Sequence, residues 1–265
     1  MSDREIVYAC RYYAPGSRKS YSHLYLIRPD STGRKQLTYA HADDTEPQWS
    51  PDGKWIAFKR DSNLMLLSPE TGTTKKLPHM PESWNALRVP EPNQDPLVLG
   101  KYTFELSFSE HAMELPNLVM NGEHLPMKGK RLPIIATPEV KRWLDSQGEV
   151  VSTFQTIKSL PNDTQHLLLY GLVGNSTNGH WKSALRISVK TGKADLALEY
   201  SILCLAPDGK HYVTSYRRDL APLGSKQVWV RSLRVGRLDK SGSQEIVKGL
   251  AFVQGYDWRG GKRIE

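Results

Sequence analysis

Short runs of apolar residues that alternate with polar ones occur along most of the chain, and turn-forming residues separate them. The first three runs cover residues 5–13, 23–27 and 35–38, and the intervening segments contain Gly, Pro and Ser. Alternation with a period of two is typical of half-buried β-strands, and runs spaced about 8–12 residues apart indicate an all-β fold. The pattern therefore predicts a chain built from short, turn-connected strands.

The best-defined hairpin surrounds the turn Pro51-Asp52-Gly53. Proline presets φ at the first central position, the Asp side chain bonds to nearby backbone, and Gly tolerates positive φ. Trp49 ends the strand before the turn, and residues 56–58 resume as a strand after it. Runs at 64–68 and 75–77 follow around a second Gly turn, which completes the unit.

The same order of elements recurs later in the chain. Pro161 and Pro207-Asp208-Gly209 occupy the place of Pro51-Asp52-Gly53, and Pro161 and Pro207 are 46 residues apart (207 − 161). Repetition at this period, with four strands in each repeat, is typical of the blades of a β-propeller. Residues 79–151 diverge from the pattern and are expected to form one decorated blade or two degenerate ones. Within them, 117–122 predicts a strand and 138–146 a helical turn, because a proline starts it and an acid follows.

The C-terminus resembles the first strand of a repeat. Residues 256–264 match residues 48–56 with one residue deleted, and Trp258 falls at the position of Trp49. The chain therefore ends after the first strand of a blade, whereas its beginning supplies the later strands of one. We expect a complete chain that forms a single propeller domain over residues 1–265. One C-terminal and three N-terminal strands would close the ring, which hides two open edges. Counting favours five blades over six.

The segment around Trp49 resembles the WD40-like repeat of TolB-type β-propellers. The residues that carry the resemblance are Gly33, Leu37-Thr38, Pro47, Trp49 to Lys54, and Ile56 to Phe58. The resemblance implies a propeller fold and agrees with use as an interaction platform. A fold alone does not specify an activity.

Composition narrows the class of protein. The 265 residues carry a net charge of +8, with a pI near 9.3, and the mean hydropathy is −0.52. No apolar run approaches the roughly 18 residues that a membrane helix needs, and the first residues do not form a signal peptide. We therefore expect no membrane insertion and an intracellular or virion-associated location. The basic balance favours acidic partners, although the positive residues are spread along the chain.

Few residues suggest cofactor or metal chemistry. Cys10 and Cys204 lie in predicted strands without metal-like spacing and are expected to be reduced core thiols. The eight histidines are not paired at ligand spacing, and His166 and His211, which follow their turns, suggest a shared structural role. Nucleophile-elbow, phosphate-loop and zinc-protease motifs are missing. No catalytic residue, cofactor or metal site is therefore predicted.

The densest polar cluster is the loop of residues 39–46. One interpretation makes His41, Asp43, Asp44 and Glu46 a partner-binding rim, or a general acid/base pair. The other is structural, with Asp44 and Thr45 fixing the entry into the next strand. Both remain open at this point.

We expect a non-catalytic, rigid docking module that binds other protein subunits in a larger assembly, such as a phage tail or capsid-associated part of a virion. Two alternatives remain. A carbohydrate-active or small-molecule enzyme would bring carboxylates such as Asp44, Glu46 and Asp257 into the propeller channel. A nucleic-acid or anionic-surface binder would use the net charge of +8.

Overall fold

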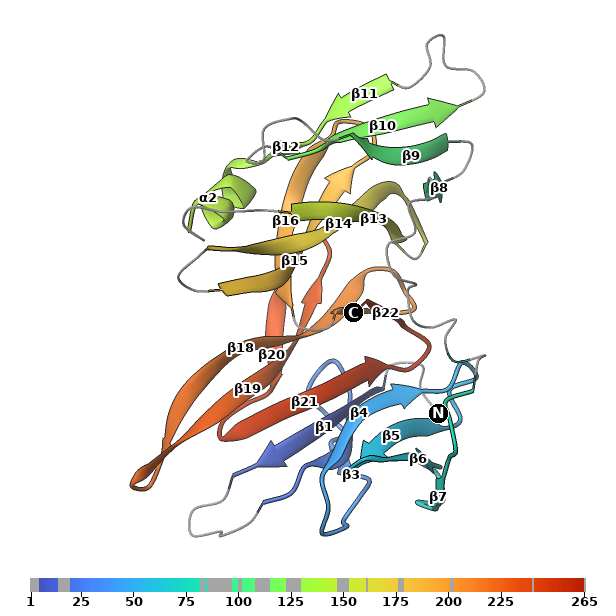
Figure 1. Cartoon of the computed structure of the whole chain (residues 1–265), viewed down its shortest axis with the longest axis vertical. Helices are drawn as coiled ribbons and strands as arrows, with labels where there is room; N and C mark the ends of the chain where they lie inside the picture. Colours follow the sequence, from blue (N-terminus) through green and yellow to red (C-terminus); the bar gives the residue numbers. More distant parts are fainter. Residues whose placement is uncertain are drawn as a thin grey trace. The chain divides into compact units, whose positions relative to one another are not determined.

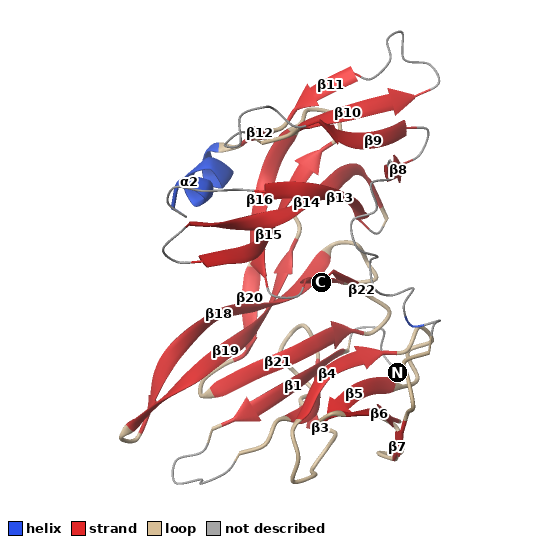
Figure 2. Cartoon of the chain, in the orientation of Figure 1, coloured by secondary structure: helices blue, strands red, loops and turns tan. Residues whose placement is uncertain are grey.

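The structure of the chain is a computed structural model. It describes residues 5–13, 20–81, 84, 97–99, 102–107, 115–122, 130–146, 153–160, 162–175, 179–200, 203–239 and 241–264. Strands dominate these residues, and α2 (Pro138–Ser146) is helical (Figure 2). The chain divides into two compact units: unit 1 comprises Met1–Val89 and Ile202–Glu265, and unit 2 comprises Pro90–Ser201.

In unit 1, the two ends of the chain share one sheet (Figure 1). β1 (Ile6–Tyr12) lies between β2 (His23–Ile27) and β21 (Ala251–Trp258) and is antiparallel to both, and β3 (Lys35–Gln36) follows β2. We call these four strands the terminal group. It consists of one C-terminal and three N-terminal strands, which is the pairing that the sequence predicts. Residues 6–10 are fully buried and divide by alternation between two hydrophobic clusters, so β1 is covered on both faces.

The Trp49 hairpin opens a separate sheet of unit 1. Its strands are β4 (Asp44–Trp49), β5 (Ile56–Arg60), β6 (Asn63–Leu67) and β7 (Thr74–Lys76), each antiparallel to the next. The predicted turn is present: Gly53 has φ +66°, and its N–H donates to Ser50 O at 2.9 Å. The Ser50 hydroxyl accepts from Trp55 N at 2.9 Å, which fixes the start of the second strand.

A third group of unit 1 follows residue 202. Its strands are β17 (Leu203–Leu205), β18 (His211–Leu223), β19 (Lys226–Arg237) and β20 (Ser243–Val247). The short β22 (Lys262–Ile264) pairs with β17, and β19 meets β21 in a parallel bridge between Arg231 and Phe252. These contacts join the third group and the terminal group into one nine-stranded sheet.

Unit 2 contains two sheets. The first consists of β8 (Leu97–Leu99), β9 (Tyr102–Ser107), β10 (Asn117–Gly122) and β11 (Lys130–Pro133). The second consists of β13 (Thr153–Leu160), β14 (Asp163–Asn175), β15 (Gly179–Ser188) and β16 (Lys193–Tyr200), with β12 (Ile135–Ala136) parallel to β16. One cluster of buried side chains, including Phe104, Leu118, Leu167 and Leu185, connects the two sheets.

The all-β fold class is confirmed. Among the described residues, the antiparallel pairings define five groups of four strands, which begin with β21, β4, β8, β13 and β17. The described sheets do not close on themselves, so the five-bladed ring stays a prediction. The strand at 117–122 and the helix at 138–146 form as predicted. Pro161 lies outside the described residues. The structure describes no helix that is both long and apolar enough to cross a membrane.

Candidate functional site

The predicted rim residues lie on the segment that leads into β4. Asp43 precedes the strand, Asp44 is its first residue, and Glu46 lies in a β-bulge between Thr45 and Gln48. His41 comes before all of them. The four residues therefore share one stretch of chain, but each of them contacts a different neighbour.

Asp43 fastens this segment to β1 and to the start of β2. Its carboxylate accepts from Arg11 Nη2, at 2.8 Å to each oxygen, and from Ser22 N at 2.7 Å. Partial burial acts to raise the pKa of the Asp43 carboxyl. The Ser22 N–H and the Arg11 guanidinium outweigh this effect, so the pKa lies below its usual range. Asp43 is therefore ionised at neutral pH and holds two strands together.

Asp44 is fully buried and forms a two-pronged ion pair with Arg60. Arg60 Nε donates to Oδ1 at 2.7 Å, and Nη2 donates to Oδ2 at 3.0 Å. The two residues are cross-strand partners on β4 and β5, and Asp44 N also donates to Ser22 O at 2.8 Å. A buried carboxylate is stable only when it is paired in this way. The Asp44 carboxylate thus fixes the entry of β4, as the structural interpretation requires.

Glu46 and His41 are the exposed members of the set. Glu46 pairs with Lys59 Nζ at 2.7 Å, and both side chains are about half exposed. The His41 ring stacks on Tyr21, with ring centroids 5.9 Å apart and an interplanar angle of 4°. These two side chains lie at the surface, where a partner could reach them, and their use as a rim stays a prediction.

A buried carboxylate, Asp257, joins the terminal group to β4. Its Oδ2 accepts from Trp49 N at 2.8 Å, and its Oδ1 accepts from Trp258 N at 2.9 Å. The Cys204 thiol lies 3.8 Å from Oδ1. Because these contacts connect segments that are far apart in sequence, Asp257 acts as a structural link between strands.

Asp257, Gln48 and Cys204 occupy the same place in their repeats, directly before Trp258, Trp49 and Leu205. Gln48 Nε2 donates to Trp84 O at 3.3 Å, and Cys204 Sγ lies 3.7 Å from Tyr256 O. In each of the three first strands of unit 1, the residue at this place therefore contacts a neighbouring segment. This rule cannot be seen in the sequence alone, because an acid, an amide and a thiol share no chemical class.

Both cysteines are buried free thiols. Burial raises the pKa of Cys10 to about 12, so this thiol is protonated and unreactive at neutral pH.

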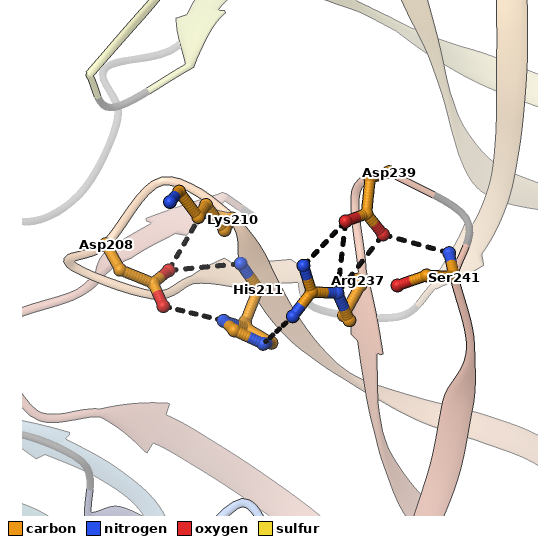
Figure 3. A network of polar contacts seen from close by, with 6 residues as sticks. All are labelled: Asp208, Lys210, His211, Arg237, Asp239 and Ser241. Carbon is orange, nitrogen blue, oxygen red and sulfur yellow. Dashed lines mark hydrogen bonds and ion pairs between the residues drawn. The ribbon is translucent and has the colours of Figure 1, made fainter.

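A surface network surrounds the turn at Pro207 (Figure 3). Asp208 Oδ2 lies 2.6 Å from His211 Nδ1, and its Oδ1 accepts from Lys210 N at 2.8 Å and His211 N at 3.1 Å. Arg237 Nη1 approaches His211 Nε2 at 3.5 Å, and Arg237 Nη2 donates to Asp239 Oδ2 at 2.6 Å. The Arg237 guanidinium holds the pKa of the Asp239 carboxyl far below its usual range.

The same Asp–His pair occurs in unit 2. Asp163 Oδ2 lies 2.9 Å from His166 Nδ1, and Asp163 Oδ1 accepts from His166 N at 3.1 Å. Two repeats therefore use an aspartate and the histidine three residues later to tie a turn to the following strand. This confirms the shared structural role predicted for His166 and His211.

Unit 2 contains a mostly apolar cavity of about 320 Å³. The residues that line it are Leu99, Tyr102, Phe104, Met120, Leu132, Thr164, Val189 and Lys190. It lies between the two sheets of the unit, and its polar side chains are the hydroxyl-bearing Tyr102 and Thr164 and the ammonium-bearing Lys190. The volume is at the low end of the range for small-molecule sites. In the parts of the chain that the structure describes, no cluster of three or more His, Cys, Asp or Glu residues could hold a metal ion.

Comparisons with known proteins give matches only among solved structures, since no family model and no curated protein matches the chain. The chain is similar to TolB from Acinetobacter baumannii, with 13% identity and a TM-score of 0.44, over 97% of this chain and 66% of that one. It thus spans just under two thirds of that protein. A putative TolB from Agrobacterium tumefaciens shows 10% identity and a TM-score of 0.40, over 95% of this chain and 91% of that one.

A third similar structure is a putative dipeptidyl aminopeptidase IV from Bacteroides ovatus. It shows 12% identity and a TM-score of 0.32, and the match covers 91% of this chain and 34% of that one. TolB proteins are therefore among the solved structures to which this chain is similar, as the residues around Trp49 predict.

Proposed function

We propose that the chain is a single five-bladed, TolB-like β-propeller that serves as a rigid, non-catalytic docking module for other protein subunits. The observation that carries this proposal is the antiparallel pairing of β21 with β1. A blade that is shared by the two ends of the chain closes a ring of blades, and such pairing also covers two edges. The described strands form five groups of four, and a propeller of five four-stranded blades needs this number of groups.

The charged side chains support a rigid scaffold. Arg11 on β1 and Arg60 on β5 bind the two aspartates at the entry to β4, and Asp257 links β21 to β4. These links restrict the relative motion of the strands that present the surface loops. A docking module benefits, because a surface that is already ordered loses less entropy on binding.

The same contacts favour docking over the enzymatic alternative. An acid that acts on a substrate needs an oxygen within reach of the reacting group. Asp44 is buried against Arg60, Glu46 pairs with Lys59, and Asp257 accepts from two backbone amides. All three candidate carboxylates thus already have partners within the protein.

The assembly that we would test first is a virus particle, with the chain as a phage tail or capsid-associated component. Purification from the native source at low and moderate salt, followed by mass spectrometry, tests the proposal. We expect protein subunits that co-purify at fixed stoichiometry under both conditions. A monomer that purifies alone would refute the docking function, and partners that are nucleic acids and dissociate as salt rises would favour the basic-surface alternative.

A further inference from the structure

The longest hairpin of unit 1 extends beyond the strands that accompany it. We call its outer part, residues 219–230, the ribbon. β18 and β19 pair from His211↔Arg237 to Leu223↔Lys226, with an irregularity between Tyr216 and Arg218. Figure 1 shows the two strands continuing together to their turn.

Other described strands pair only with the inner part of this hairpin. β17 pairs with residues 212–214, β20 pairs with β19 from Leu233 onward, and β21 meets β19 at Arg231. Within the described part of the chain, the ribbon is therefore a two-stranded structure with a strand edge on each side. Two-stranded hairpins are marginally stable in water, so a third strand would stabilise it.

The two edges of the ribbon differ in chemistry. Gly224 and Ser225 form a two-residue turn, and Gly224 has φ +61°, which suits the first position of a type II′ turn. Because Leu223 and Lys226 flank this turn as a hydrogen-bonded pair, the next pair, Pro222↔Gln227, is a non-hydrogen-bonded one.

The backbone nitrogens of Pro222 and Gln227 consequently face outward, on opposite edges. Proline has no N–H, so the β18 edge lacks a donor at this point and is blunted. Gln227 presents an N–H at the equivalent place of the β19 edge. An added strand therefore finds its donor on β19.

Apolar side chains accompany this edge. Leu220 and Trp229 are cross-strand partners with 52% and 45% of their surface exposed. They point to the same face of the ribbon, as do Pro222 and Gln227 two residues along. A strand added beside β19 would place its own side chains against Trp229.

The charge of the segment selects the partner. The ribbon itself carries one acid, Asp219, and one base, Lys226, and the arginines Arg217, Arg218 and Arg231 flank it directly in the sequence. Residues 217–231 therefore have a net charge of +3 (4 − 1), which is concentrated where the ribbon begins and ends. Two copies of this segment would repel each other if they paired edge to edge. An acidic strand would be attracted, and its backbone could pair with the edge in a way that a nucleic acid cannot.

We propose that the β19 edge of the ribbon, centred on Gln227, binds an extended acidic segment of a partner protein as an added β-strand. This inference rests on the proposed docking function and specifies the mode of binding and the chemistry of the partner.

A pair of variants at Gln227 tests the proposal. Gln227→Pro removes the outward N–H without removing a bond of the hairpin, and thereby copies Pro222 on the other edge. Gln227→Thr is the matched control, because it changes the side chain but keeps the N–H. The probe is a fluorescent heptapeptide of alternating Glu and Val, and its anisotropy is measured against protein concentration. A peptide of alternating Lys and Val controls for charge.

We expect saturable binding of the acidic peptide to the natural protein and to Gln227→Thr, with affinity that falls as salt rises. Binding to Gln227→Pro should be at least tenfold weaker. Equal binding to Gln227→Pro, or no saturable binding to the natural protein, would overturn the proposal. So would tighter binding of a single-stranded oligonucleotide, or a dimer in sedimentation that Gln227→Pro abolishes.

Two further measurements keep the test decisive. Hydrogen exchange on the natural protein should show protection of residues 227–230 when the acidic peptide is added, and lack of protection would overturn the proposal even if Gln227→Pro failed to fold. The Gln227→Pro variant, produced in the native source in place of the natural protein and then purified, distinguishes a failure of this inference from a failure of the docking function. Partners that still co-purify at the natural stoichiometry would refute the role of the ribbon and leave the docking function intact.

Discussion

The sheets of unit 1 and the sheets of unit 2 are joined by different kinds of contact. In unit 1, a buried polar side chain supplements the apolar contacts between two sheets: Asp257 on β21 accepts from Trp49 N on β4. In unit 2, apolar side chains such as Phe104 and Leu167 belong to a cluster that connects the two described sheets. A hydrogen bond requires one partner in one geometry, whereas apolar packing accepts many combinations of similar volume.

This difference fits the contrast between unit 1, where the repeat is obvious, and the first sheet of unit 2, where it is faint. The second sheet of unit 2 keeps the turn of the repeat at Asp163 and His166. Where a directed contact joins two sheets, the turn and the residues before it must hold a fixed register, and a short motif results. Where the contact is generic, sequence can drift while the strands persist. Residues 79–151, which diverge most, still supply a four-stranded sheet at β8–β11.

The largest effect that we predict is in unit 2. Phe104→Ala should lower the free energy of unfolding by roughly 3–5 kcal/mol, because a buried ring is lost beside an existing cavity. The conservative variant Phe104→Leu should cost only about 1–1.5 kcal/mol if packing is generic. Urea denaturation measures both values. Equal losses for the two variants would show that the packing around Phe104 is specific and not generic.

In unit 1, a conservative substitution at Asp257 should cause a larger fraction of the loss seen with alanine than Phe104→Leu does in unit 2. Asp257→Ala leaves two buried N–H groups, of Trp49 and Trp258, without their acceptor and should cost about 3 kcal/mol. Asp257→Asn has nearly the same shape, but its amide group can accept from only one of these donors. Asp257→Asn should therefore lower the free energy of unfolding by roughly half as much as Asp257→Ala does. A neutral Asp257→Asn would show that the joint is as tolerant as the one in unit 2.

Much of this fold was predictable because local chemistry determined it. The turn at Pro51-Asp52-Gly53 specified a hairpin, and the similarity of residues 256–264 to residues 48–56 predicted the pairing of β21 with β1. The length of β18 and β19 was not predictable, since the sequence of the ribbon carries no signal for where its accompanying strands end. The parallel pairing of β12 with β16 was not predictable either, because β12 has only two residues and so shows no alternation.

The candidate site was predictable in position but not in chemistry. The polar loop at 39–46 lies where the sequence placed it, at the entry to β4. Arg11 lies 32 residues before its partner Asp43, and Arg60 lies 16 residues after its partner Asp44. In the sequence alone, both arginines look like ordinary surface charges at strand ends. Only the fold brings these guanidinium groups to Asp43 and Asp44, and it thereby turns a possible acidic site into two ion pairs.

A smaller effect is expected where β21 passes close to β4. A methyl group added at Gly255 would lie 3.0 Å from Glu46 Cα and 3.2 Å from Pro47 Cδ. Since backbone cannot move aside as a side chain can, Gly255→Ala should cost about 2 kcal/mol. A urea titration measures the loss. An unchanged midpoint would mean that the directed contacts of this joint tolerate a shift of β21 as readily as the apolar packing of unit 2 tolerates a change of shape.

The smallest effect concerns the exposed end of the same joint, at Asp43. Its pKa in the folded protein lies below the unfolded value of about 3.9. The folded state therefore gains stability from Asp43 above that pH and loses it as the pH falls through the lower, folded value. Because the side chain is 38% exposed and solvent screens the pair, Asp43→Asn should cost only about 1 kcal/mol at pH 7. The loss should begin to shrink as the pH falls below about 3.9, and it should vanish once the pH has passed below the lower pKa of the folded state, where the natural carboxyl is neutral too. Urea titrations of both proteins across this range measure the difference, and Arg11→Gln provides the reciprocal control. A loss that stays constant with pH would show that hydrogen-bond geometry, rather than charge, makes Asp43 useful at this joint.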